Sequence, residues 1–228
     1  ALDAALRGDG RGVMNGGTIE DAGGGEIAAE LLIAVRMMQT EAASADGRVD
    51  YGRLRASEAY QAYRACTRRL VSFDPAALTS IPERLAFWIN LYNALILDAV
   101  ITFGIHGSVR EDLGLFRRAA YLVGGRRYSA DAIEHGILRG NRRHFHPAIP
   151  FPQFSPGDPR LRYSLAGVDP RVHSALVCAS RSCPPFAALD SQQIEEQLDA
   201  ASRSFVNGGA VTLGEDGSSL RLSRIFRW

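Results

Sequence analysis

One long apolar stretch constrains the fold of this chain more than any other feature of its sequence. Residues 86–105 read AFWINLYNALILDAVITFGI, and their apolar side chains would fall on every side of a helix. The stretch is long enough to cross a membrane, but Asn90, Asn93 and Asp98 would each be costly in lipid. We therefore predict a buried helix over residues 87–103 at the centre of a soluble fold.

Two asparagines in this helix lie three residues apart and share one face. A buried amide that finds no hydrogen-bond partner costs about 1–3 kcal/mol, so each side chain needs partners. Either Asn90 and Asn93 tie neighbouring loops to the helix, or one of them orients a catalytic group. The first role is the more common one for buried amides.

The composition is that of an ordinary soluble globular protein and excludes several classes of function. Of the 228 residues, 46% are hydrophobic and 22% are charged, and the net charge is +1. That balance gives no reason to expect nucleic acid or a membrane surface as a partner. All 26 basic residues are arginine, which excludes a catalytic lysine, and three cysteines are too few for a disulfide-rich scaffold.

The first 25 residues are rich in glycine and show no sustained periodicity, so we predict a flexible arm over residues 1–25. Their glycines match neither the dinucleotide-binding nor the P-loop spacing, and we expect no cofactor. The chain begins with Ala1 and shows no charged and apolar leader pattern. We expect either a cytoplasmic protein or the mature form of an exported one.

The remainder, residues 26–228, predicts a single α+β domain that is mainly helical. Two hairpins are indicated, one around Gly124 and Gly125 and one around the GEDGSS turn at residues 214–219. Around the central helix, periodicity and capping residues predict helices over residues 26–40, 51–70, 130–139 and 192–206. Cys66 lies inside the second of these, where a lone cysteine is usually a small core residue.

Residues 140–161 contain five prolines and no periodicity, which is typical of a long loop. The loop holds His144 and His146, whose spacing would suit a metal ion. No carboxylate or cysteine lies beside them, and we therefore predict no metal site.

The segment with the most chemical potential is DPRVHSALVCASRSCPPF, residues 169–186, which holds a histidine and two cysteines. Its compact apolar residues predict a short buried strand over residues 171–178, which the following prolines must end. That places Cys178 on the last position of the strand and Cys183 in the turn beyond it. Catalytic and binding groups often lie at such edges.

The partner of Cys178 has to be argued from geometry. On a strand, His173 and Cys178 point to opposite faces because they are five positions apart, an odd number. We therefore expect His135 to serve as the base. Asp131, His135 and Arg139 lie at four-residue intervals and form one polar stripe, whose alternative role is a structural salt-bridge ladder.

Several roles remain open for the two cysteines. A nucleophilic Cys178 would need a positive neighbour, which Arg171, Arg181 or an arginine of the polar stripe could supply. Alternatively, Cys178 and Cys183 form a disulfide. They could also bind a metal together with His173, although their spacing is unusual for zinc. The last alternative is that both remain buried, unreactive thiols.

Four segments, AFWINLYNAL, YLVGGRRYSADAIEHGILR, DPRVHSALVCASRSCPPF and LSRIF, occur in this order and resemble the bacterial and plant family catalogued as domain of unknown function 547. The resemblance covers about residues 46–228, and in that family the pattern continues beyond the final IFRW. Related plant sequences keep the first of the two cysteines more faithfully, which implies that Cys178 is the functional thiol. The family's motif positions fall on Trp88, Asn90, Tyr92, Asn93, Glu134, His135, Arg139, His173, Cys178, Cys183 and Pro184.

There is also a looser likeness to papain-like and transglutaminase-like folds, in which a central helix begins with the nucleophilic cysteine. Here Phe87 and Trp88 stand at that helix start, so the usual nucleophile is missing. We expect a thiol-dependent acyl-transfer or hydrolytic enzyme with Cys178 as nucleophile, His135 as base and an asparagine of the central helix as orienting group. The alternatives are a non-catalytic module with a buried polar network that binds a small molecule or peptide, and a thiol–disulfide or metal role.

Overall fold

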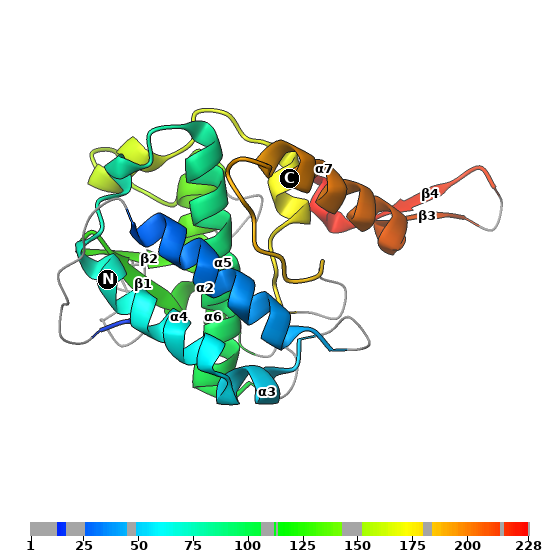
Figure 1. The fold of residues 1–228 in the computed structure, drawn as a ribbon. Coiled ribbons are helices and arrows are strands. Elements are labelled where there is room, and N and C mark those ends of the chain that lie inside the picture. Colours follow the sequence, from blue (N-terminus) through cyan, green and yellow to red (C-terminus); the bar gives the residue numbers. More distant parts are fainter. Residues whose placement is uncertain are drawn as a thin grey trace.

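The computed structural model describes residues 13–16, 26–44, 49–105, 112, 114–142, 152–179, 184–214 and 217–227. They form the predicted mainly helical α+β domain around one buried helix (Figure 1). The helices are α2 (Ile27–Ala42), α3 (Tyr51–Ala56), α4 (Glu58–Arg69), α5 (Ile81–Phe103), α6 (Leu115–Arg118) and α7 (Ile194–Phe205), joined by short 3-10 turns. Two antiparallel hairpins pair β1 (Ala120–Val123) with β2 (Arg126–Ser129), and β3 (Val211–Leu213) with β4 (Leu220–Leu222).

Helix α5 is the predicted central helix, and Figure 1 shows it upright with α2 and α4 running diagonally across it. Ser80 and Glu83 form a capping box at its start, and Gly104 ends it in a left-handed conformation at φ 63°. Every residue from 85 to 100 is buried. By length and composition α5 could cross a membrane, but 89% of its most apolar window is covered by the rest of the fold.

A buried carboxylate ties α4 and β1 to α5. The side chain of Asp98 is fully buried and accepts hydrogen bonds from the hydroxyls of Tyr60, Tyr121 and Thr102. The guanidinium of Arg64 lies 2.7 Å from the second carboxylate oxygen. Asp98 was predicted to be costly in lipid, and here its charge is balanced by a complete set of polar partners.

The predicted helix over residues 51–70 is divided in two at Ser57. The backbone of Ser57 ends α3, and its hydroxyl oxygen accepts the Tyr60 N–H at 3.2 Å to begin α4. The predicted turn at Gly124 and Gly125 lies against the end of α4, where Gly124 N–H donates to the Leu70 carbonyl at 3.0 Å. A Cβ atom on Gly124 would approach the Phe73 carbonyl oxygen to 2.8 Å, so this turn needs glycine.

Part of the predicted flexible arm is docked on the domain. The Met14 N–H donates to the Ala120 carbonyl at 2.9 Å, and Asn15 is buried. The Asn15 amide donates to the carbonyls of Thr67 and Leu122 and accepts the Leu122 N–H at 2.8 Å. Residues 13–16 therefore form a short attachment to β1, while residues 1–12 and 17–25 lie outside the described part of the chain.

The predicted strand over residues 171–178 was wrong. Pro170–Ser174 form a 3-10 helix, with the Asp169 carboxylate accepting the Arg171 N–H at 2.9 Å. Asp followed by Pro is a helix-start signal, and it outweighed the apolar run that favoured a strand. Residues 176–178 have irregular backbone and belong to neither of the two sheets in the described part of the chain. The argument that His173 and Cys178 lie on opposite faces of a strand therefore does not apply.

Candidate functional site

Two asparagine side chains of α5 hold the cysteine-containing segment at both ends. The Asn93 amide donates to the Ala175 carbonyl at 2.9 Å and accepts the Val177 N–H at 2.8 Å. The Asn90 amide does the same with Leu189, donating to its carbonyl at 2.7 Å and accepting its N–H at 2.8 Å. Both amides thus tie loops to the core helix, which is the first of the two roles expected from the sequence.

Cys178 follows directly after the segment held by Asn93. It is half-buried and disulfide-bonded, while Cys66 is a free, buried cysteine. Cys183 is the only other cysteine of the chain and lies outside the described residues. The next residue, Ala179, has a left-handed φ of 54°, which is uncommon for a residue with a side chain.

The predicted helix after β2 is a π-helix, Ala132–Leu138, and its Ser129 cap accepts the Ala132 N–H at 3.1 Å. π-Helical turns are rare and occur frequently at functional sites. Within this element Arg139 Nη1 lies 2.7 Å from Nδ1 of His135. A guanidinium has only donors, so His135 Nδ1 is the acceptor and the ring carries its proton on Nε2.

This contact bears on the expected role of His135. Its Nε2 lies 3.9 Å from a carboxylate oxygen of Glu134, and both residues are largely buried. With Nδ1 accepting from Arg139 and Nε2 protonated, the ring has no free lone pair for a thiol proton. His135 can act as a base only if Arg139 moves away from Nδ1.

Glu134 has the properties of an acid–base group. Burial raises its pKa to about 7, and the nearby Asp131 carboxylate contributes in the same direction. Burial also raises the pKa of Asp131, to about 6. The Tyr92 hydroxyl donates to Glu134 Oε2 at 3.2 Å, and the Glu134 side chain remains 18% exposed. A carboxyl group that titrates near neutral pH can both take up and release a proton at physiological pH.

His173 completes this polar cluster. It is buried, and burial together with the charge of Arg139 lowers its pKa to about 4. The imidazole is therefore neutral at pH 7. Arg139 binds Nδ1 of His135, and its positive charge lowers the pKa of His173. Arg139 therefore interacts with both histidines. The cluster consists of Tyr92, Glu134, His135, Arg139 and His173.

The family model for the protein of unknown function DUF547 matches residues 76–206, which is more than half of the chain. This chain belongs to the DUF547 family. No curated protein and no solved structure matches it. The matched part of the DUF547 domain contains α5, the first hairpin, the π-helix, the segment with Cys178 and α7, whereas β3 and β4 follow it.

Three positions predicted for the DUF547 site lie away from the polar cluster or have packing roles. Arg171 forms ion pairs with Asp169, Glu195 and Asp199, so its charge is used between the 3-10 turn and α7. Trp88 is fully buried, with its ring 4.9 Å from that of Tyr128. Asn90 binds only backbone, as described above.

Glu134 was predicted only as a supporting position, and the sequence did not reveal that its pKa is raised to about 7. Its pKa depends on burial beneath α5 and on Asp131, which no spacing rule reveals. The one available signal was its adjacency to His135 within a family motif. Pro184 begins a stretch without helix or strand, residues 184–190. Within the described residues it makes no contact with the polar cluster.

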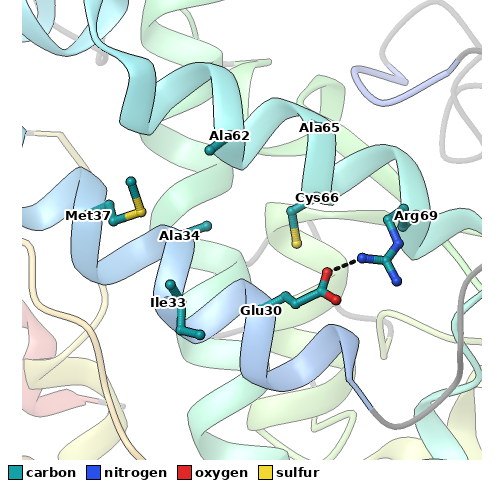
Figure 2. A pocket seen from close by; sticks show the side chains of 8 residues that line it. All are labelled: Glu30, Ile33, Ala34, Met37, Ala62, Ala65, Cys66 and Arg69. Atoms are coloured by element: carbon teal, nitrogen blue, oxygen red, sulfur yellow. Dashed lines mark hydrogen bonds and ion pairs between the residues drawn. The ribbon is translucent and has the colours of Figure 1, made fainter.

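A hollow between α2 and α4 of the DUF547 chain contains the free thiol. Figure 2 shows the Cys66 sulfur between the two helices, with the Glu30–Arg69 ion pair beside it. The hollow has a volume of about 340 Å³. Burial raises the pKa of Cys66 to about 11, so this thiol is protonated at neutral pH. It behaves as the small core residue that the sequence predicted.

The described residues contain no group of three or more histidine, cysteine, aspartate or glutamate side chains placed to hold a metal ion. His144 and His146 lie outside them, so the prediction for that pair stays a prediction.

Proposed function

We propose that this DUF547 domain is a thiol-dependent hydrolase or acyltransferase in which Cys178 is the nucleophile and Glu134 the acid–base group. The observation that carries the proposal is the raised pKa of Glu134, about 7, in a cluster anchored to the same turn of α5 as the Cys178 segment. Strongly shifted pKa values beside a specific polar partner are typical of functional sites.

Adjacent residues of α5 contact the segments that carry the two proposed groups, which supports the proposal. Tyr92 donates to Glu134, and Asn93 binds Ala175 and Val177, directly before Cys178. Both side chains are buried, and their partners are fixed by hydrogen bonds. The same helix thus limits the movement of the carboxyl group and of the chain before Cys178, which is what the proposed reaction needs.

The remaining members of the cluster support this assignment. The charge of Arg139 and the hydrogen bond from Tyr92 favour the ionised form of Glu134, while Arg139 also contacts the His135 ring at Nδ1. In the proposed reaction, Glu134 takes the proton of the Cys178 thiol as the sulfur attacks an acyl carbon. It then returns that proton to the leaving group, a contribution of about 100-fold to 10,000-fold for general acid–base catalysis.

The disulfide at Cys178 holds the nucleophile in an inactive form, so the proposed enzyme works after reduction. The test is the pH dependence of iodoacetamide labelling of the fully reduced protein, followed for each cysteine by mass spectrometry. Labelling of Cys178 should rise with an inflection near pH 7, where Glu134 ionises. Cys66, whose pKa is about 11, is the internal control and should stay unlabelled at that pH.

Glu134→Gln is the matched variant, because it keeps size and hydrogen bonding and removes the titration. It should move the inflection of Cys178 to the ordinary thiol range near 8.5 and slow labelling at pH 7 about tenfold. Identical profiles for the wild type and Glu134→Gln, both near 8.5, would refute the catalytic assignment.

The second candidate function is a non-catalytic binding module. It is favoured by one observation, that both asparagine amides and Cys178 already have structural partners, so the polar cluster could simply stabilise the fold. In that case Cys178→Ser should fold normally, and Cys178 in the reduced protein should label as an ordinary thiol.

A further inference from the structure

A second hollow, distinct from the polar cluster, lies between the end of α2 and the extended residues 184–187. Its volume is about 560 Å³, within the range of small-ligand sites. Arg36, Gln39 and Thr40 line it from α2, and Pro185 and Phe186 line it from the extended segment. We call it the Phe186 hollow.

The walls of the Phe186 hollow are fixed by hydrogen bonds. Gln39 Oε1 accepts the Ala188 N–H at 2.9 Å, and Arg36 Nη2 lies 2.7 Å from the Asp190 carboxylate. On the other side of the segment, the Asn90 amide holds Leu189 to α5. The extended segment is therefore held between two helices, and the site exists before any ligand arrives.

Two residues beside this hollow have backbone groups that form no hydrogen bond within the part of the chain that the structure describes. Neither Phe186 nor Ala187 forms a backbone hydrogen bond with any described residue, although Phe186 is only 8% exposed. Buried backbone groups are nearly always paired, so this gap is unusual. Phe186 lines the hollow, and two residues further along the chain the Ala188 N–H donates to Gln39 on the α2 wall of the same hollow.

Gln39 adds a donor at the same place. Its Oε1 must be the acceptor of the Ala188 N–H, so its Nε2 is the free end of the amide and forms no hydrogen bond with the described residues. The site therefore offers one backbone donor, one backbone acceptor and one amide donor. Its apolar lining comes from Ala42, Val49 and the side chains of Pro185 and Phe186.

We propose that the Phe186 hollow binds an extended peptide, one residue of which pairs with the backbone of Phe186 while its apolar side chain enters the hollow. A peptide residue supplies a donor and an acceptor together, as β-strand addition requires. A carboxylate ligand fits less well, because the cation of the hollow, Arg36, is already paired with Asp190. The proposal concerns binding only and does not depend on the thiol chemistry proposed above.

The test uses N-acetyl-Ala-Val-Ala-amide as the probe, titrated into the full chain and followed by amide NMR signals. The backbone signal of Phe186 and the side-chain amide signal of Gln39 should shift and saturate. The same peptide with its central valine N-methylated has lost one donor and should bind at least tenfold more weakly. This comparison uses the wild-type protein alone, so it does not depend on any variant folding.

Two variants on α2 locate the site. Thr40 is an exposed residue at the rim of the Phe186 hollow. Thr40→Phe adds an aromatic ring there that should obstruct the peptide and weaken binding at least tenfold. Met37→Phe is the matched control, because Met37 lies one turn earlier and lines the other hollow; it should bind like the wild type. Absence of saturable shifts, equal binding of the methylated peptide, or equal binding by Thr40→Phe would each overturn the proposal.

Discussion

Replacing Asn93 by alanine removes both hydrogen bonds that fix the chain before Cys178. The Ala175 carbonyl and the Val177 N–H, bound at 2.9 and 2.8 Å, would then be left without partners in the interior. Each such group costs about 1–3 kcal/mol, which gives about 2–6 kcal/mol for the pair. Asn93 itself is fully buried, so water cannot replace the lost amide without opening the site. We therefore expect Asn93→Ala to lower the free energy of unfolding by about 4 kcal/mol.

Urea unfolding at constant m value measures this change, with Asn207→Ala as control, since Asn207 is exposed and its loss should cost less than about 0.5 kcal/mol. Amide hydrogen exchange adds a local readout. In Asn93→Ala the Val177 amide should exchange faster, whereas the Leu189 amide, held by Asn90, should keep its protection. A cost below about 1 kcal/mol, or equal loss of protection at both amides, would show that the reasoning about this amide is incorrect.

Three further predictions follow from groups described above. The raised pKa of Glu134 means that the folded state binds more protons than the unfolded state between pH 4.5 and about 7. Stability should therefore fall across that range by up to about 3 kcal/mol, and Glu134→Gln should flatten the curve measured by urea unfolding at each pH. Asp98→Ala should cost about 3–5 kcal/mol by urea unfolding, because it leaves a guanidinium and three hydroxyls without their acceptor. Thiol titration in denaturant should find one free cysteine per chain, Cys66, before reduction and three after it; three before reduction would rule out the disulfide at Cys178.

The helices and hairpins were largely predictable because each rests on a local signal. The apolar run of α5, the diglycine turn between β1 and β2, and the periodicity of α2 and α7 all correspond to elements of the structure. The errors have equally local causes. Ser57 can both end one helix and cap the next, which divides the predicted helix over residues 51–70. Asp169 and Pro170 start a 3-10 turn where the apolar pattern alone favours a strand.

The candidate site was predictable in its members but not in its connections. Asn90 and Asn93 were expected to be satisfied by partners, yet no sequence rule identifies Leu189, Ala175 or Val177 as those partners. The contact from Arg139 to Nδ1 of His135 agrees with their four-residue spacing in the sequence, but periodicity did not reveal that the element is a π-helix. Tertiary burial sets the pKa values, and for that reason we propose the acid–base role for Glu134 and not for His135.

The two asparagines separate the two proposals along a single stretch of chain. Asn93 fixes the residues before Cys178 and has no contact with the Phe186 hollow, whereas Asn90 fixes Leu189 beside that hollow. Loosening the Asn93 attachment should therefore alter the reactivity of the thiol more than peptide binding, and loosening the Asn90 attachment should do the reverse. Pro185 and Phe186 follow Cys178 closely in the sequence, so a peptide bound at the hollow would contact the same stretch of chain that carries the proposed nucleophile. That arrangement gives a physical reason for the core helix to carry two buried asparagines despite the cost of burying their amides.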